Sequence, residues 1–265
     1  METSPTDYTY SDFERIDIYP TSYREFLDAP CKIINLDRNV DRLKTSLERV
    51  QEAGFTNVSR FSAVNGKDSA ALWKGLEIVG FPNFAYKYDM SIITELGVQG
   101  CFLSHLAIWK EMIDNKIPYM VVFEDDVLFH SGWHRLAPAY FEHTPIGYDV
   151  VYIGNRNDYQ KNAHIEKNVP VFCTHAMLLS YNGVKKLWDI LLNLSVGIYP
   201  VDTMIRDAII AMKESHPITT YTWNVVDFFP CDSKKMGRES TRRNNGMVFQ
   251  DEQFGTDVNP IYFLN

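Results

Sequence analysis

The sequence predicts an α/β fold with a mostly parallel sheet and helices on both of its faces, and three observations indicate this class. Apolar runs of strand length alternate with segments whose apolar residues recur at helical spacing. Polar clusters follow three of the predicted strands, which is where ligands bind in such sheets. The length of 265 residues suits one large domain or two small ones, and the chain has no internal repeat.

The first part of the chain is predicted to form a strand, a helix and a second strand. Residues 31–36 are a short apolar run. The helix expected over 39–53 has apolar residues at helical spacing and stops at Gly54. The second strand covers 58–64 and ends in the turn dipeptide Asn65-Gly66.

The same alternation continues in the rest of the chain. Residues 67–96 are interrupted by Gly and Pro, so we expect a loop with short helical pieces there. Residues 100–114 carry an apolar stripe that is typical of a helix. Further strands are predicted over 118–124, 148–154, 171–180 and 219–229, with helices over 183–194 and 203–214 that Asn182 and Asp202 can cap.

These elements place a single domain at residues 30–235. Residues 1–29 are polar and rich in Tyr, and we expect them to form a loosely structured arm. Residues 236–265 form a polar tail that, with the basic segment Lys234–Arg243, could cover an active site and exclude water. A solvated, mobile tail is the alternative.

Composition excludes some classes of partner. The net charge of −8 argues against a nucleic-acid partner, which would need a basic surface. The four cysteines have no zinc-site spacing, so we expect buried free thiols in a reducing compartment. The N-terminus lacks the pattern of a signal peptide, and no apolar run reaches the length of a membrane span. We therefore expect a cytoplasmic protein.

The most informative motif is a run of three carboxylates at the end of a buried strand. The apolar run Tyr119–Phe123 leads directly into Glu124, Asp125 and Asp126. Adjacent carboxylates repel one another, and their burial costs solvation energy. A hard cation such as Mg²⁺ or Mn²⁺ would offset both costs, because carboxylate oxygens are its preferred ligands. A strand that ends in a solvated acidic turn is the simpler alternative.

Two arginines could hold a phosphate near this cation. Arg38 and Arg42 lie four residues apart, just after the first predicted strand. Metal sites with few protein carboxylates are usually completed by substrate phosphates. Solvated arginines on a helix are the alternative, and the chain has no glycine-rich phosphate loop.

Several segments, in order, resemble glycosyltransferase family 25, which contains bacterial lipooligosaccharide galactosyltransferases and procollagen galactosyltransferases. Asn65 stands where the family more often has Asp. The resemblance covers roughly residues 31–235. It is carried by Ile33–Arg38 with Asp41-Arg42, Phe61–Asp68, the Gly-Cys-x-x-Ser-His segment within Leu96–His105, Phe123–Val127, and Thr174–Leu187.

The resemblance implies a GT-A-like fold and an inverting, metal-dependent transfer of a sugar from a UDP-sugar to a hydroxyl of a glycan or glycoprotein acceptor. Galactose is the first choice of sugar, and glucose and xylose stay open. The metal, Mn²⁺ or Mg²⁺, is expected on Glu124 and Asp126. With the strand-end positions, the resemblance indicates a donor site formed by Asn35, Asp37, Arg38, Arg42, Asn65, Gly66, Ser104, His105 and Asp125.

The catalytic base is predicted from chemistry. Direct displacement with inversion needs a carboxylate that takes a proton from the acceptor hydroxyl. Asp202 is the first candidate, although its position before a helix also suits a capping residue. Asp149 and Asp207 are rival candidates.

Two other functions stay open at this point. A nucleotidyl or phosphoryl transferase also pairs a carboxylate cluster with Mg²⁺, but a nucleotidyl transfer would release pyrophosphate. A glycan-binding module that has lost catalysis is the alternative from a non-enzyme class.

Overall fold

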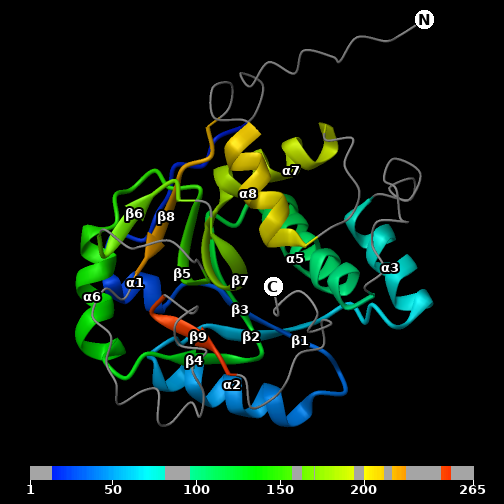
Figure 1. Ribbon diagram of the computed structural model, residues 1–265, viewed down its shortest axis with the longest axis horizontal. Helices are drawn as coiled ribbons and strands as arrows, with labels where there is room; N and C mark the ends of the chain where they lie inside the picture. The colour runs from blue at the N-terminus through cyan, green and yellow to red at the C-terminus, as the bar shows by residue number, and fades with distance from the viewer. Residues whose placement is uncertain are drawn as a thin grey trace, which may run out of the picture.

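The computed structural model describes residues 14–80, 96–156, 163–169, 171–193, 200–211, 217–224 and 246–251. Seven strands form one sheet in the order β2-β1-β3-β7-β5-β8-β6, and β4 and β9 form a separate pair (Figure 1). The strands of the described residues are β1 (Cys31–Asn35), β2 (Val58–Ser62), β3 (Tyr119–Glu124), β4 (Val127–Phe129), β5 (Val150–Arg156), β6 (Ile165–Lys167), β7 (Phe172–Ser180), β8 (Thr220–Trp223) and β9 (Val248–Gln250).

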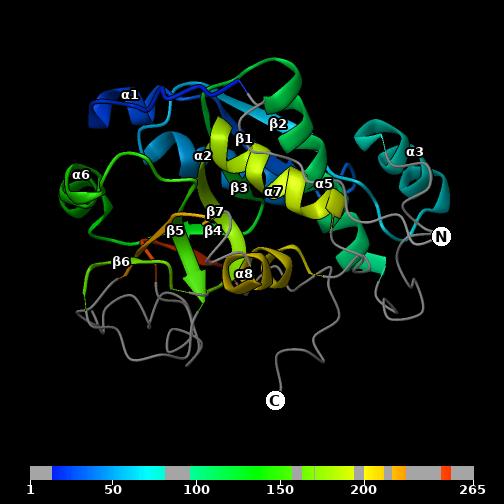
Figure 2. The same ribbon diagram turned by 90° about the horizontal axis from the view of Figure 1, so that it is seen from above.

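Helices pack on both faces of the seven-stranded sheet (Figures 1 and 2). One face is covered by α3 (Ser69–Val79), α5 (Leu96–Asp114), α7 (Tyr181–Asn193) and α8 (Val201–Ala211). The other face is covered by α1 (Tyr23–Leu27), α2 (Val40–Glu52) and α6 (Trp133–His143). Among the described residues, no helix has the length and apolar character needed to cross a lipid bilayer.

The central strands are apolar throughout because successive side chains point to opposite faces of the sheet. In β3, Met120 and Val122 belong to the core beneath α5 and α7. Val121 and Phe123 belong to the core on the other face. All four side chains are fully buried. The uninterrupted apolar run in the sequence therefore reflects a strand that is covered on both sides.

Five of the seven strands of the main sheet run in the same direction. β1 is parallel to β2 and β3, and β5 is parallel to β8. β7 lies between β3 and β5 and is antiparallel to both, and β6 is antiparallel to β8 at the sheet edge. The predicted α/β class, the mostly parallel sheet and the helices on both faces are therefore confirmed.

Two segments that were expected to be irregular each contain a helix among their described residues. Within the predicted arm, α1 buries Phe26 completely, and its ring contacts those of Phe55 and Phe141. Within 67–96, α3 begins after Asp68, whose carboxylate accepts hydrogen bonds from the first backbone N–H groups of the helix. The glycines of this segment made it look irregular, but Gly80 ends the helix in a left-handed conformation.

Other elements carried no usable sequence signal. Helix α6 contains Pro138, which breaks the expected pattern, and β6 and β9 have three residues each. Within the predicted tail, β9 pairs with β4 in antiparallel orientation. Outside the described residues lie 236–245 and 252–265 of that tail, the basic segment Lys234–Arg243 and residues 1–13.

The start of α5 packs against the loop after β2 through two glycines. An added Cβ at Gly66 would lie 1.5 Å from the carbonyl oxygen of Leu96. An added Cβ at Gly100 would lie 2.4 Å from the carbonyl oxygen of Val64. Only glycine allows the two backbones to approach this closely. Since this contact fixes the start of α5, it also positions Ser104 and His105 farther along the same helix.

The substitution Gly100→Ala tests this contact. Helix propensity alone would make it stabilising by about 1 kcal/mol. The clash with backbone atoms should instead make it destabilising by about 1–3 kcal/mol in the free energy of unfolding, measured by urea denaturation. Gly75→Ala in α3 is the control, because its Cβ would meet only side-chain carbon atoms, at 3.2 Å or more. A stabilised Gly100→Ala protein would contradict the close approach.

Candidate functional site

Polar side chains from three strands meet at one edge of the sheet. β1 and β3 are parallel and end there, so Ile34 lies beside Glu124 and Asn35 follows at the end of β1. β7 runs in the opposite direction, and Ala176 lies beside Phe123. The first residues of β7 therefore reach the same edge as the last residues of β1 and β3. This edge carries the acidic motif Glu124-Asp125-Asp126.

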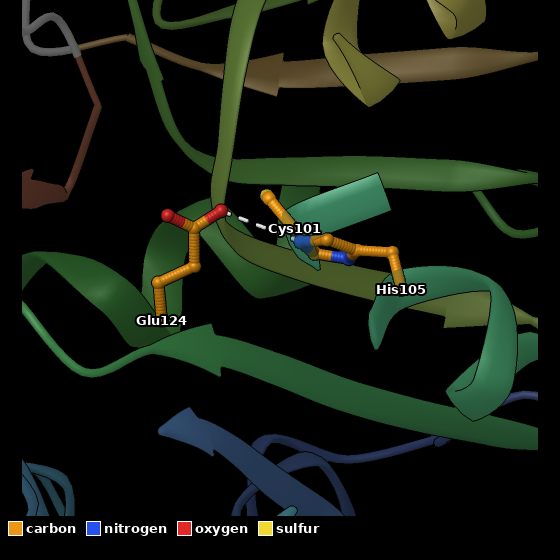
Figure 3. A group of neighbouring side chains, drawn as sticks. All are labelled: Cys101, His105 and Glu124. Atoms are coloured by element: carbon orange, nitrogen blue, oxygen red, sulfur yellow. Dashed lines mark hydrogen bonds and ion pairs between the residues drawn. The ribbon is translucent and has the colours of Figure 1, made fainter. Parts of the chain in front are cut away.

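Glu124 is held by two hydrogen-bond donors. Its Oε1 accepts a hydrogen bond from Oγ1 of Thr174 at 3.0 Å and one from Nε2 of His105 at 3.3 Å. Burial opposes ionisation, but these donors and the nearby His175 outweigh it and lower the pKa of the Glu124 carboxyl. The second carboxylate oxygen points away from His105 (Figure 3). Glu124 is therefore a fixed anion with one oxygen directed away from these donors.

Asp125 points toward basic and amide groups of the protein. One of its carboxylate oxygens lies 2.5 Å from Nη2 of Arg42, and the other accepts a hydrogen bond from Nδ2 of Asn35 at 2.6 Å. Asn35 is almost fully buried, and its Oδ1 accepts a hydrogen bond from Arg60. The three predicted donor-site residues Asn35, Arg42 and Asp125 thus form a network around the middle carboxylate of the acidic motif.

Asp126 is the least compensated member of the motif. It is about nine-tenths buried, and its Oδ1 has no hydrogen-bond partner. Its Oδ2 lies 3.7 Å from Arg42 and 3.5 Å from the side-chain amide of Gln250. Burial and the neighbouring charge of Glu124 raise the pKa of Asp126 to about 8, although Arg42 acts in the opposite direction. A buried, unpaired carboxylate oxygen is where a cation would bind favourably.

A second set of possible metal ligands lies on the other side of Glu124. Sγ of Cys101, Nε2 of His105 and a carboxylate oxygen of Glu124 lie within 4.8 Å of one another (Figure 3). This mixed set suits Zn²⁺ or Co²⁺ better than Mg²⁺. Burial and the charges of Glu124 and Asp202 raise the pKa of the Cys101 thiol well above its usual value. The thiol is therefore protonated unless a metal displaces the proton.

The remaining predicted donor residues lie at the rim of this edge or support it. Arg38 is exposed, and its Nη1 donates a hydrogen bond to Oδ1 of Asn65 at 3.2 Å. Asp37 is exposed and accepts a hydrogen bond from Ser62 at 2.7 Å. Ser104 is fully buried, and its Oγ accepts a hydrogen bond from the backbone N–H of Val64.

Gly66 and Ser104 both serve the packing of α5 against the loop after β2. Gly66 provides the close backbone approach, and Ser104 bonds to the same loop. The Ser104 hydroxyl accepts a hydrogen bond from the backbone of Val64 and donates one to the carbonyl oxygen of Gly100. These contacts help to place His105, and a part of Gly66 and Ser104 in the donor site stays a prediction.

The candidate bases Asp202 and Asp149 lie near opposite ends of the central strands. Asp149 precedes β5, and its carbonyl oxygen bonds to Ser180, which lies beside Tyr119 at the start of β3. Glu124 lies five residue steps along the strand from Tyr119, or about 16 Å. The Asp149 carboxylate is also paired with Lys186 at 2.7 Å. The structure therefore places Asp149 away from the acidic edge.

Asp202 lies close to the acidic edge. Its Oδ2 accepts a hydrogen bond from the backbone N–H of Cys173 at 2.9 Å, and its Oδ1 accepts one from Thr203 at 2.7 Å. Cys173 has a positive φ of 71° and directly precedes Thr174, the partner of Glu124. The rival Asp207 instead pairs with the adjacent Arg206 near the surface.

Sequence reasoning missed four residues of this edge: Cys101, Thr174, Gln250 and Asp251. Cys101 and His105 lie four residues apart on a predicted helix, and this spacing could have indicated a shared face. No sequence signal connects Thr174, Gln250 or Asp251 with the acidic motif, because their approach depends on the strand order.

The substitution Asp126→Asn tests whether this carboxylate binds a cation. In metal-free protein above pH 8 it removes a poorly compensated buried charge without a change in volume, so the melting temperature there should stay equal or rise. Mn²⁺ should raise the melting temperature of the wild type but not that of Asp126→Asn. Asp114→Asn, in the exposed pair with Lys110, is the control and should respond like the wild type. An equal Mn²⁺ response in Asp126→Asn would place the cation elsewhere.

A known protein family matches most of this chain. The family is described as Glycosyltransferase family 25 (LPS biosynthesis protein), and the match covers residues 29–205. This range includes β1, β3, β7 and the acidic motif, and it ends before β8 and β9.

Some curated relatives are named as galactosyltransferases, and others are named as inactive members of the family. Procollagen galactosyltransferase 2 of Homo sapiens is 28% identical over 205 residues, which cover 71% of this chain and 31% of the relative. Inactive glycosyltransferase 25 family member 3 of Mus musculus is 29% identical over 171 residues, which cover 58% of this chain and 28% of the relative. The chain thus spans less than a third of the length of these relatives.

Two solved structures are distantly similar to this chain. A glycosyltransferase involved in the glycosylation of the major capsid of PBCV-1 has a TM-score of 0.34 and 8% identity, covering 71% of this chain and 69% of that chain. Mouse Xyloside xylosyltransferase 1 has a TM-score of 0.36 and 12% identity, covering 85% of this chain and 84% of that chain. The sequence match, and not these scores, identifies the family. The chain belongs to glycosyltransferase family 25.

Proposed function

We propose that this chain is a metal-dependent, inverting glycosyltransferase with a GT-A-like fold. The proposed donor is a UDP-sugar, with galactose as the first choice and glucose or xylose next. The proposed acceptor is a hydroxyl group of a glycan or glycoprotein. Membership of the family and the relatives named procollagen galactosyltransferases support this choice.

The observation that carries the proposal is that the three carboxylates of the acidic motif are compensated unequally by the protein. Asp125 is neutralised by Arg42, and Glu124 is held by His105 and Thr174. Asp126 keeps a buried oxygen without a partner. We assign Mn²⁺ or Mg²⁺ to Glu124 and Asp126, where the bound ion would act as a Lewis acid on a leaving diphosphate.

The nucleotide part of the donor is proposed to bind beside this cation, over the ends of β1 and β2. Arg38 and Asn65 lie at the rim there, joined by a hydrogen bond. A guanidinium group at this position can bind a phosphate or ribose oxygen. Asn35 and Arg42 are assigned a supporting role, since both are engaged with Asp125.

An inactive glycan-binding module is the second candidate. The names of three relatives favour it, because they are described as inactive or probably inactive members of the family. Against it stands Asp126, which keeps one buried carboxylate oxygen without a hydrogen-bond partner, since a module without a metal-dependent reaction has no need of this costly group.

An assay with UDP-galactose, UDP-glucose and UDP-xylose in the presence of Mn²⁺ tests the proposal. We expect release of UDP from one donor, and loss of this activity in EDTA and in the Asp126→Asn variant, with Asp114→Asn as the active control. Release of pyrophosphate from a nucleoside triphosphate would favour a nucleotidyl transferase instead. Binding of glycans without turnover of any donor would favour the inactive module.

Asp202 is the proposed base, and Asp202→Asn tests it. Loss of a general base should lower kcat by about 100-fold or more. Both carboxylate oxygens accept backbone hydrogen bonds, so the variant should also lose about 1 kcal/mol of stability, which a simple capping role would not predict. Steady-state kinetics and urea denaturation measure the two effects. Unchanged kcat in a destabilised protein would assign Asp202 to the turn at Cys173 alone.

A further inference from the structure

Strand β9 contacts the acidic motif from the far end of the chain. It pairs with β4, so that Gln250 lies beside Val127. The backbone N–H of Asp251 donates a hydrogen bond to the carbonyl oxygen of Asp126 at 2.5 Å. The side-chain amide of Gln250 also lies 3.5 Å from Oδ2 of Asp126. The segment thus touches both the backbone and the carboxylate of one proposed metal ligand.

Arg49 fixes this strand from the last turn of α2. Its Nη1 donates a hydrogen bond to the carbonyl oxygen of Val127 at 3.0 Å. Its Nη2 lies 2.6 Å from Oδ2 of Asp251, and both side chains are mostly buried. One planar guanidinium group therefore binds both strands of the β4–β9 pair, directly after the acidic motif. An ion pair in this setting is screened less by solvent than an exposed pair.

The other side of β9 contacts the neighbourhood of Glu124. Nε2 of His175 donates a hydrogen bond to the carbonyl oxygen of Val248 at 2.9 Å. His175 follows Thr174, which bonds to Glu124. Gly154 leaves room for this contact, because an added Cβ there would lie 2.6 Å from the same carbonyl oxygen. Strand β9 therefore lies between groups that hold Glu124 and groups that hold Asp126.

We propose that the segment Met247–Asp251 is a positioning element of the metal centre, fixed in place by the Arg49–Asp251 ion pair. Gln250 is the residue that orients the Asp126 carboxylate. This inference rests on the proposed function, and it assigns a role to residues beyond the range 29–205 that the family match covers. Groups that orient a metal ligand commonly change metal affinity by about 10–100-fold when they are removed.

The experiment compares Mn²⁺ dissociation constants, measured by electron paramagnetic resonance, in the 265-residue chain. Gln250→Leu should raise the constant about tenfold with little change in melting temperature. Arg49→Met and Asp251→Asn should each raise it to a similar extent, and the double variant should add little to either, because both remove the same ion pair. Arg24→Met, which breaks the exposed pair with Asp28, is the matched control and should bind Mn²⁺ like the wild type.

The outcomes separate this inference from the proposed function. Mn²⁺ binding in the wild type that changes less than twofold in Gln250→Leu and Arg49→Met would overturn the positioning role and leave the metal site intact. A lower melting temperature with unchanged Mn²⁺ affinity in Arg49→Met would show that the ion pair only stabilises the fold, which also overturns it. A wild-type protein that binds no Mn²⁺ would overturn the metal site and the inference together.

Discussion

The accumulation of negative charge at the buried end of β3 is the constraint on which the rest of this site depends. Asp125 is balanced by Arg42 and Asn35, and Glu124 by His105 and Thr174. Asp126 keeps a buried oxygen without a hydrogen-bond partner. The protein thus compensates two of three adjacent carboxylates with its own groups, and the third is left as the place where a cation gives the largest gain.

The reversed direction of β7 determines which residues surround that charge. In a purely parallel sheet, this edge would receive only strand ends such as Asn35 and Glu124. Because β7 runs the other way, its first residues, including Thr174, arrive there instead of its last. The same geometry leaves Asp149 at the opposite edge. The site therefore brings together residues that are far apart in the sequence, such as Glu124 and Thr174.

The reversed direction of β7 explains which parts of the site could be predicted from the sequence and which could not. The buried strands, the long helix α5 and the acidic motif were predicted correctly, since each follows from a local pattern of apolar and polar residues. The same patterns could not place Asp149, Thr174 or Gln250, because strand direction and strand order are set by packing across the whole sheet. Gly66 was predicted as a donor contact, and the structure shows in addition that it packs against the backbone of α5.

A crystal structure with Mn²⁺ and UDP, with anomalous scattering recorded at the manganese edge, tests the central claim most directly. The account predicts one anomalous peak within about 2.5 Å of a carboxylate oxygen of Asp126, with the diphosphate completing its coordination. A peak bonded to Sγ of Cys101 and Nε2 of His105, with Asp126 still unpartnered, would contradict the assignment of the metal to the acidic motif. So would a diphosphate bound with no metal at this edge of the sheet.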